Sequence, residues 1–254
     1  MHILIGTLHT IEKEYDECIA SIHAQSYSSY QHFVLRDHPN KEAHSILYRT
    51  FMERASEFDL FMKVDADMVL QDEHLFARIV DKFQANAWLM DLEIAVHDFF
   101  SDQLIWGMHT YRNTVRWPDT DEDLFTDACP VEASETIHDD SELAPAAVHC
   151  PNPSAFQALH YGVHRALKTV QPGRLRVRAS HARYHWDNLQ STRHNFLRTR
   201  DERIGFALLG AELVFKGGIK PEHLSYSNPF LRTAFEPYAQ LDASRLEREI
   251  RRVS

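Results

Sequence analysis

Two carboxylates separated by one residue, Asp65 and Asp67, follow a mostly apolar run in the stretch DLFMKVDADMVL at residues 59–70. The run predicts a buried strand, so the two acids come at its end. Neighbouring buried carboxylates resist joint ionisation, and a divalent cation removes that cost. Carboxylate oxygens suit hard cations, whose coordination shell substrate phosphates often complete. The pair therefore predicts a site for Mn²⁺ or Mg²⁺ and a phosphate-bearing ligand, with two exposed acids on a turn as the alternative.

Strand and helix patterns alternate through the first part of the chain and predict an α/β fold, a mostly parallel sheet covered by helices. Apolar runs predict strands at 2–8, 32–37, 60–64, 87–96 and 104–115, and apolar residues at helical spacing predict helices at 12–26, 41–57 and 72–84. Ligands bind at the carboxyl ends of the strands in such sheets. Because Asp37 ends the second strand, we expect it to converge with Asp65 and Asp67 on one edge.

The chain changes character between Trp117 and Pro153, where prolines and acids replace the regular patterns. Residues 117–164 contain no Lys or Arg, whereas residues 165–203 carry ten of them against three acids. We interpret this either as a solvated acidic loop beside basic helices or as a cleft with a basic wall for phosphate. Further helices are predicted at 154–170, at 183–215 as one long or two consecutive helices, and at 244–253 as an amphipathic tail with a capping box from Ser244 to Glu247.

Three segments, taken in order, resemble the nucleotide-binding half of a GT-A glycosyltransferase, in particular of family 2. They are ILIGT, CIASIHAQSYSSYQHFVLRD and DLFMKVDADMVL. The most specific piece is Ser21-Ile22-x-x-Gln25-Ser26-Tyr27, which is similar to the S-[IL]-x-x-Q-[ST]-Y of that family. The resemblance covers residues 1–115 and implies a GT-A (Rossmann-like) fold, with a nucleotide-sugar-binding half at 1–115 and an acceptor-binding half with C-terminal helices at 116–254.

The resemblance also implies roles for single residues. Asp37 would face the nucleobase, Thr7 would contact the nucleotide, and Asp65 and Asp67 would hold the ribose and a metal that bridges the diphosphate. Many such enzymes take a third metal ligand from a downstream histidine, and among the 17 histidines we choose His149 in AAVHCPNPS. The sequence departs from the family at two points, with RDHPN in place of DDGSxD and GTLHT in place of PxYN.

Sugar transfer needs a neutralised diphosphate, an oriented acceptor hydroxyl and, in inverting enzymes, a carboxylate that takes the proton. We expect that base in the acidic stretch 119–142, with Asp127 in LFTDACP as first choice, Glu132 next, and Glu122 and Asp123 as alternatives. The expected protein is thus a transferase that uses Mn²⁺ or Mg²⁺ and a nucleoside-diphosphate sugar, with UDP as the default nucleotide. Its acceptor would be a hydroxyl of a saccharide or glycolipid.

Other functions fit part of the pattern. VDADMVL also matches the D-x-D-x-[TV]-[LV] motif of haloacid-dehalogenase-type phosphatases, in which Asp65 would be the nucleophile and Asp67 the acid. That fold needs a later acidic pair ending an apolar strand, and Asp139 and Asp140 follow no predicted strand. A nucleotidyltransferase would need a Gly-rich phosphate loop that the first strand lacks. A non-catalytic nucleotide-sugar-binding homologue is the remaining alternative.

Composition narrows the class of protein and its surroundings. The 254 residues carry a net charge of −10, which argues against non-specific nucleic-acid binding. No apolar window is long enough to span a membrane and the N-terminal apolar run is too short for a signal peptide, so we expect a cytoplasmic protein. Three widely spaced cysteines predict no disulfide framework. The arginine-rich tail at 244–253 could make a peripheral contact with an anionic membrane surface.

Overall fold

The computed structural model describes residues 1–118, 123–126, 135–226 and 228–251. The chain divides into two compact units, which are described separately. The first consists of Met1–Phe99, Leu104–Asp121 and Thr126–Pro151, and the second of Phe100–Gln103, Glu122–Phe125 and Asn152–Ser254. The sheet belongs to the first unit, and the helices that follow residue 152 belong to the second.

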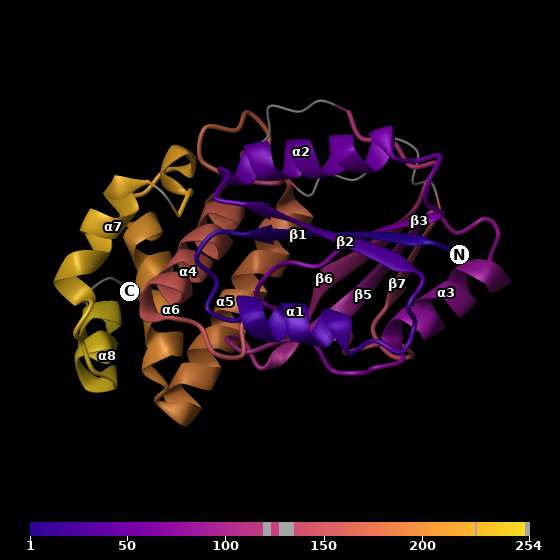
Figure 1. The fold of residues 1–254 in the computed structure, drawn as a ribbon. Coiled ribbons are helices and arrows are strands. Elements are labelled where there is room, and N and C mark those ends of the chain that lie inside the picture. The colour runs from indigo at the N-terminus through magenta and orange to yellow at the C-terminus, as the bar shows by residue number, and fades with distance from the viewer. Residues whose placement is uncertain (119–122, 127–134, 227, 252–254) are drawn as a thin grey trace. The chain divides into compact units, whose positions relative to one another are not determined.

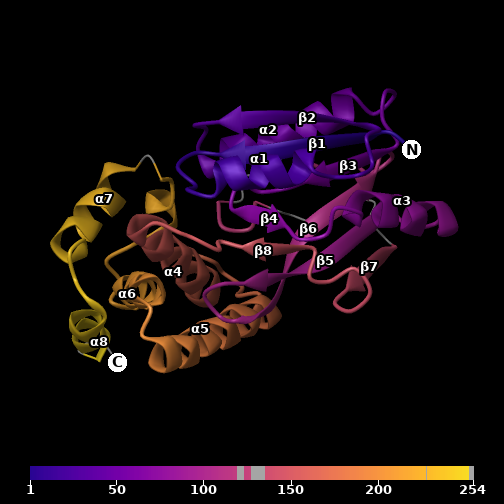
Figure 2. The same ribbon diagram turned by 60° about the horizontal axis from the view of Figure 1, so that its bottom comes forward.

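The first unit is built on an eight-stranded sheet with the strand order β2-β1-β3-β6-β5-β8-β4, and β7 pairs with β5 (Figure 1, Figure 2). The strands are β1 Ile3–His9, β2 Tyr30–Arg36, β3 Leu60–Lys63, β4 Met68–Leu70, β5 Asp91–Asp98, β6 Gln103–Arg112, β7 Thr136–Asp139 and β8 Ala147–His149. Its helices are α1 Tyr15–His23, α2 Asn40–Glu53 and α3 Leu75–Ala85. The predicted alternation of strands and helices up to β6 is confirmed, whereas β4, β7 and β8 were not predicted.

The sheet is mixed, which corrects the expectation of a mostly parallel sheet. Strand β1 runs parallel to β2 and β3, but β3 pairs antiparallel with β6, and β4 pairs antiparallel with β8. Only residues 99–102 connect β5 to its neighbour β6. A parallel crossover needs a dozen or more residues, so a connection this short requires a reversal of direction. The fold is therefore α/β with a mixed sheet, in which β1 pairs parallel with β2 and β3, and β5 pairs parallel with β7 and β8.

Residue alternation along the strands explains how helices cover both faces of the sheet. Ile3 and Ile5 of β1 pack in one apolar core with Ile22 of α1 and with the apolar face of α3. Leu4, between them, points to the other core, where it packs with Phe51 of α2. Figure 1 shows α1 and α2 on opposite sides of β1 and β2. The two cores hold the strand ends, and thus the acids after β3, at one edge.

Ser21 of the motif Ser21–Tyr27 connects α1 to β4, the strand that follows Asp67. Its hydroxyl donates to the carbonyl of Cys18 at 2.7 Å and accepts from the N–H of Leu70 at 3.1 Å. A buried backbone N–H without a partner is costly, so this bond stabilises β4, which is the last strand in the order of the sheet. The serine of the motif therefore has a structural role close to the acids.

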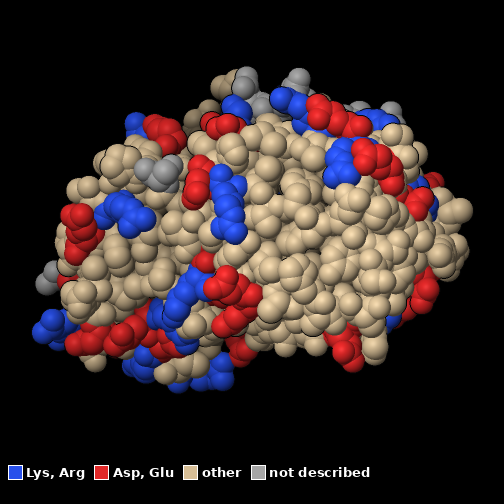
Figure 3. Space-filling view, viewed as in Figure 1, with Lys and Arg blue, Asp and Glu red and all other residues tan. Residues whose placement is uncertain are grey.

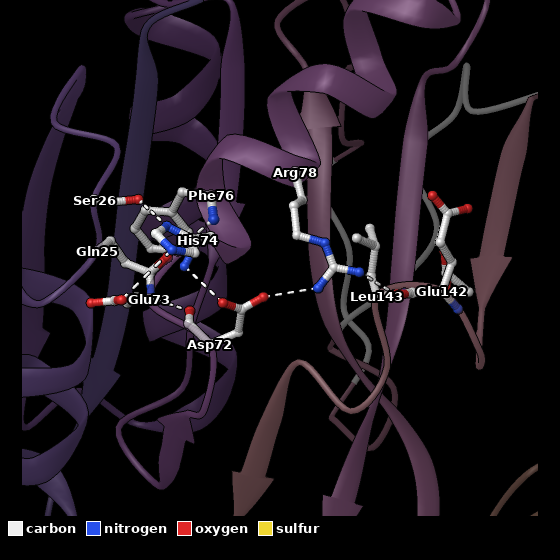
Figure 4. A network of polar contacts seen from close by, with 10 residues as sticks. Gln25, Ser26, Asp72, Glu73, His74, Phe76, Arg78, Glu142 and Leu143 are labelled. Carbon is white, nitrogen blue, oxygen red and sulfur yellow. Dashed lines mark hydrogen bonds and ion pairs between the residues drawn. The ribbon is translucent and has the colours of Figure 1, made fainter.

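Gln25 of the same motif holds the beginning of α3 (Figure 4). Its Nε2 donates to the carbonyl of Asp72 at 2.7 Å, and its Oε1 accepts from the N–H of Phe76 at 3.0 Å. The carboxylate of Asp72 accepts from the N–H of His74 at 2.8 Å and pairs with Arg78 at 2.8 Å. Helix N-termini leave backbone N–H groups unsatisfied, and these side chains supply their partners. The motif thus fixes β4 through Ser21 and the beginning of α3 through Gln25.

The second unit is helical. Its helices are α4 Ala155–Val170, α5 Ala179–Thr199, α6 Glu202–Phe215, α7 Pro229–Phe235 and α8 Ala243–Arg251, with 3-10 turns η1 Pro221–His223 and η2 Glu236–Tyr238. Ser154 begins α4 with a capping box to Gln157, in agreement with the predicted start. Residues 183–215 form two helices, because Arg200 adopts a left-handed φ of 59° and Asp201 caps α6. The predicted cap of the tail helix is wrong, since Asp242, not Ser244, accepts from the N–H of Arg245 at 2.9 Å.

Helices α4 and α6 approach closely at two glycines. A Cβ on Gly162 would lie 1.6 Å from the carbonyl oxygen of Ala207, and one on Gly210 would lie 2.1 Å from that of Leu159. Both distances are far below van der Waals contact, so only glycine allows these backbones to approach. The pair of glycines therefore sets the core of the second unit.

The surface carries both signs of charge. On the face shown in Figure 3, Lys and Arg lie beside Asp and Glu, and the area over β1 and β2 is mostly uncharged. Interspersed charges produce no strong single-sign field on that face. No helix of the described residues is long and apolar enough to cross a membrane.

Candidate metal and nucleotide site

Strand pairing brings Asp67 and His149 together. Met68 lies opposite His149 in the antiparallel β4–β8 pair, and the N–H of Cys150 donates to the carbonyl of Asp67 at 2.7 Å. As a result, Nε2 of His149 lies 3.5 Å from Oδ2 of Asp67. We expected the histidine to reach the acid from an irregular loop. The structure corrects that route, because β8 lies within the stretch 117–153 and places the histidine by pairing.

Cys150 adds a sulfur atom to this pair. Its thiol donates to Oδ2 of Asp67 at 3.3 Å, lies 3.6 Å from Nε2 of His149, and is buried. The residue adopts a left-handed φ of 51°, which is uncommon for a residue with a Cβ and directs this side chain. One atom from each of the three residues lies within 4.8 Å of the others, and this is the one such group of potential metal ligands in the described part of the chain.

Asp98 orients the histidine from behind. Its Oδ1 lies 2.7 Å from Nδ1 of His149, and the aspartate is completely buried. Burial alone would lower the pKa of His149, but Cys150, Asp67 and Asp98 raise that pKa well above its ordinary value. A carboxylate that accepts from Nδ1–H leaves Nε2 directed at a metal, the usual arrangement around metal-bound histidine. Binding of a metal there would displace a proton from the imidazole.

The residues fit a divalent cation, as one atom in particular indicates. Oδ1 of Asp67 is buried without a hydrogen-bond partner. Burial would raise the pKa of Asp67, but His149, Cys150 and Lys63 lower it, so the group is an anion with an unsatisfied oxygen. Burial also raises the pKa of Glu12 to about 7, and the charges of Asp67 and nearby acids add to the rise. Such a cost is normally offset by a bound cation.

Asp65 does not share this cluster. Its Oδ2 forms an ion pair of 2.6 Å with Nζ of Lys63, which is almost completely buried. Cys18 donates its thiol to the backbone carbonyl of Asp65 at 3.5 Å. The two acids of the motif are therefore compensated differently, Asp65 by the ammonium and Asp67 by its contacts to the histidine and thiol. This arrangement favours Asp67 over Asp65 as a ligand for a cation.

The structure places the other predicted nucleotide contacts at the same edge. Asp37 follows β2, is exposed, and adopts a left-handed φ of 60°, while its N–H donates to the carbonyl of His9 at 3.0 Å. Thr7 is buried in β1, and its hydroxyl pairs with Nε2 of His32 at 2.9 Å. The parallel strands β1, β2 and β3 end side by side, so the predicted convergence on one edge is confirmed for Asp37 and Asp65. Contact of either residue with a nucleotide stays a prediction.

Both predicted bases lie outside the described residues. Asp127 and Glu132 fall within 127–134, so the structure gives them no position. Trp117, at the start of the irregular stretch, is buried and stacks on Tyr48 with ring centroids 4.7 Å apart. Asp139 ends β7 and accepts from three backbone N–H groups, so an acidic strand end exists where none was predicted.

A second acid–histidine cluster is an ion pair and not a metal site. Nδ1 of His109 lies 3.4 Å from Asp91, and its Nε2 lies 3.3 Å from Glu93. Burial lowers the pKa of His109, but the two carboxylates outweigh it and raise the pKa to about 10. Glu93 also pairs with His138 at 2.8 Å. The two carboxylates lie at opposite nitrogens of the ring and so do not converge on one point, and this cluster stabilises the sheet by charge pairing.

Sequence reasoning missed Cys150, Asp98 and Lys63. Two of them carried a signal, since Cys150 directly follows the chosen histidine and Asp98 stands two residues beyond a predicted strand. The register of β5 and β8 places Asp98 opposite His149. That register depends on residues far apart in the chain, so the sequence pattern did not predict it.

Comparison with known proteins adds two remote likenesses. No protein-family model and no curated protein matches this chain. Among solved structures, it is similar to the mannosyltransferase PcManGT from Pyrobaculum calidifontis, whose structure contains GDP-Man and Mn²⁺, with 11% identity over 94% of this chain and 88% of that one at a TM-score of 0.42. It is also similar to protein A197 from STIV, with 15% identity over 38% of this chain and 47% of that one at a TM-score of 0.29. TM-scores this low carry no argument, so the proposals below rest on the residues of this chain.

Proposed function

We propose that the protein is a metal-dependent glycosyltransferase that moves a sugar from a nucleoside-diphosphate sugar, UDP being the expected nucleotide, to a hydroxyl of a saccharide or glycolipid. One observation carries this proposal. The buried, unpartnered carboxylate oxygen of Asp67 lies beside His149 and Cys150 at the ligand-binding edge of the sheet. This edge follows the motif Ser21–Tyr27, which resembles that of GT-A enzymes.

Each residue has a distinct task in this proposal. Asp67 and His149 would hold a divalent cation, with Cys150 as a further ligand and Asp98 fixing the ring of His149. When bound, such a cation acts as a Lewis acid on the diphosphate leaving group. The ion pair with Lys63 would position Asp65 to accept from a ribose hydroxyl.

The acceptor proton needs a carboxylate, for which Asp127 and then Glu132 remain our candidates. The test is turnover of the donor by Asp127→Asn and Glu132→Gln. The variant that removes the true base should lose roughly 10²–10⁴ in kcat, the range of general-base catalysis, while its binding of the nucleoside diphosphate is unchanged. Equal kcat in both variants and wild type would exclude them as the base.

The proposed function is tested by thermal stability in the presence of nucleotides. UDP, GDP and CMP are added to the full chain with and without Mn²⁺ or Mg²⁺, and the shift in Tm is measured. A ligand at 100 times its Kd stabilises the folded state by about 2.7 kcal/mol, which is a readily measured shift. We expect stabilisation by a nucleoside diphosphate that requires the metal and is lost in Asp67→Asn.

The matched control is Asp81→Asn, which removes an exposed carboxylate from α3. This variant should retain the full nucleotide effect. Absence of stabilisation by every nucleotide, with either metal, would refute the transferase proposal.

The phosphatase alternative predicts a different result with the same variants. It requires Asp65 as nucleophile, yet Asp65 is held by Lys63, and Asp139 is used by its own turn. Release of phosphate from a generic phosphomonoester, abolished by Asp65→Asn, would favour that function over the transferase.

A further inference from the structure

The connection between α4 and α5, residues 171–178, exposes aliphatic and basic side chains in alternation; we call it the basic loop. Leu175 has a relative exposure of 104% and Val177 one of 52%. Arg176 between them is exposed, and Arg174 and Arg178 flank the pair. A fully exposed leucine gains nothing in water, and exposed apolar residues that gather at one place mark an interaction surface.

A buried glutamine fixes the shape of this loop. Gln171 is 1% exposed, and its Nε2 donates to the carbonyls of Lys168 and Arg178 at 3.1 Å each. Its Oε1 accepts from the N–H of Arg178 at 2.9 Å. One amide thus joins both ends of the loop, so Leu175 and Val177 are held in their exposed positions. A partner binding them would meet a preformed surface, which lowers the entropic cost of binding.

Positive charge surrounds the loop. Residues 165–186 contain five Arg and one Lys and no acid. The cationic groups of Lys168, Arg174 and Arg178 lie 5.6, 4.8 and 5.0 Å from the ring centroid of Phe125. Burial, followed by the charges of nearby cations, lowers the pKa of His185 to about 2.

Among the described residues of the second unit, few acids accompany these cations. Asp123 precedes Phe125 by two residues, and Asp187 pairs with Arg183 at 3.7 Å. The described side chains near the basic loop thus carry an excess of positive charge, which would attract an anionic partner.

We propose that the basic loop docks on an anionic phospholipid surface, with Leu175 and Val177 inserted between the headgroups and Arg174, Arg176 and Arg178 at the lipid phosphates. An amphipathic segment of this kind binds through buried apolar area and attraction to anionic lipids. A small soluble phosphate would engage the arginines but leave both aliphatic side chains in water. A nucleic acid would do the same, and it is disfavoured by the net charge of −10.

This surface takes the place of the tail helix as the expected membrane contact. Leu246 of α8 is completely buried and Ile250 is 8% exposed, so the apolar face of that helix already packs within its own unit. Leu246 and Ile250 are therefore not available to insert into a membrane beside the arginines of α8. The inference on the basic loop is independent of the proposed transferase activity, and its test uses neither metal nor nucleotide.

The test is co-sedimentation of the full chain with vesicles of phosphatidylcholine, with and without phosphatidylglycerol. We expect binding only to the anionic vesicles, and weaker binding as salt is raised. Arg176→Gln should lower the partition coefficient about fivefold, the usual effect of one basic residue at an anionic surface. The double variant Leu175→Ser with Val177→Ser should lower it by about tenfold or more, because both lose their apolar area.

Matched controls remove the same side chains from other surfaces. Leu197→Ser replaces an exposed leucine of α5, and Arg248→Gln an exposed arginine of α8, and both should bind as wild type. All variants are at exposed positions, and their circular dichroism and Tm verify the fold.

Three results would overturn the inference. The first is equal binding of wild type and the loop variants to anionic vesicles, and the second is no binding to such vesicles at all. In that second case, protection of the loop from proteolysis by inorganic phosphate would identify it as a site for a soluble phosphate.

The third result is self-association of the wild type, measured by sedimentation, that Leu175→Ser abolishes. A second copy of the chain would then cover the loop.

Discussion

Replacing Asp98 with asparagine tests whether the cluster around Asp67 is a metal site. Asp98 is completely buried, and its Oδ1 lies 2.7 Å from Nδ1 of His149. Asparagine has nearly the same shape but no charge, so the substitution removes mainly the charge assistance of one hydrogen bond. That bond holds the proton on Nδ1 and directs Nε2 at the metal.

The size of the effect follows from the hydrogen bond. A bond to a charged group contributes roughly 1.5–3 kcal/mol, against about 1 kcal/mol for a neutral one. The loss of about 1–2 kcal/mol corresponds to a roughly 5- to 30-fold weaker metal affinity, which overlaps the 10- to 100-fold range for partners of metal-bound histidines. We expect Asp98→Asn to bind Mn²⁺ with a Kd raised by about tenfold.

Isothermal titration calorimetry of Mn²⁺ measures this Kd, and repeating it in buffers of different ionisation enthalpy counts the protons released. Release of protons is expected because the metal must displace them from His149 and Cys150. The control is Glu93→Gln on the same strand, since Glu93 pairs with His109 and His138 and not with His149. An unchanged Kd in Asp98→Asn, equal to that of the control and wild type, would refute the role of Asp98 and His149 in holding the metal.

Three further predictions concern stability, measured by chemical denaturation. The pKa of His109 is raised from 6.5 to about 10 in the folded state. The contribution of its ion pairs to the free energy of unfolding is therefore fully present below pH 6.5 and is lost as the pH rises through about 10. The unfolding free energy of the wild type should fall over that pH interval, and it should fall less steeply with pH in His109→Gln. An equal dependence on pH in both proteins would contradict the ion pair. Gly162→Ala should destabilise the protein by about 3 kcal/mol or more, because its Cβ would lie 1.6 Å from the carbonyl oxygen of Ala207; a change below about 1 kcal/mol would show that the helices separate at little cost. Gln25→Ala should cost about 2–4 kcal/mol because it leaves the N–H of Phe76 and a neighbouring carbonyl without partners, and a cost no larger than that of an exposed glutamine would contradict this role.

Local sequence patterns determined the secondary structure that leads to the acids. Apolar spacing predicted β1, β2, β3, β5 and β6 and the helices α1–α3, because strands and helices of that length repeat their side chains with a clear period. The same patterns placed Asp65 and Asp67 after β3 and Asp37 after β2. These are short-range properties, so neighbouring residues suffice to specify them.

Strand pairing, by contrast, was decided only in the tertiary structure. Strands β4 and β8 have 3 residues each, too few to show a period, and the partners Met68 and His149 are far apart in the chain. Their pairing makes the sheet mixed and selects one histidine among 17. It also brings Cys150 and Asp98 to that histidine, through contacts that no local pattern encodes.

For Asp65 and Asp67, too, the sequence determines one property and the tertiary structure another. The sequence predicted that both follow a strand, and the structure places both in the short connection between β3 and β4. Only packing decided that Asp65 is neutralised by the buried Lys63 while Asp67 keeps one oxygen unpartnered. Charge compensation depends on which groups share a desolvated space, and that space exists only after the chain has folded.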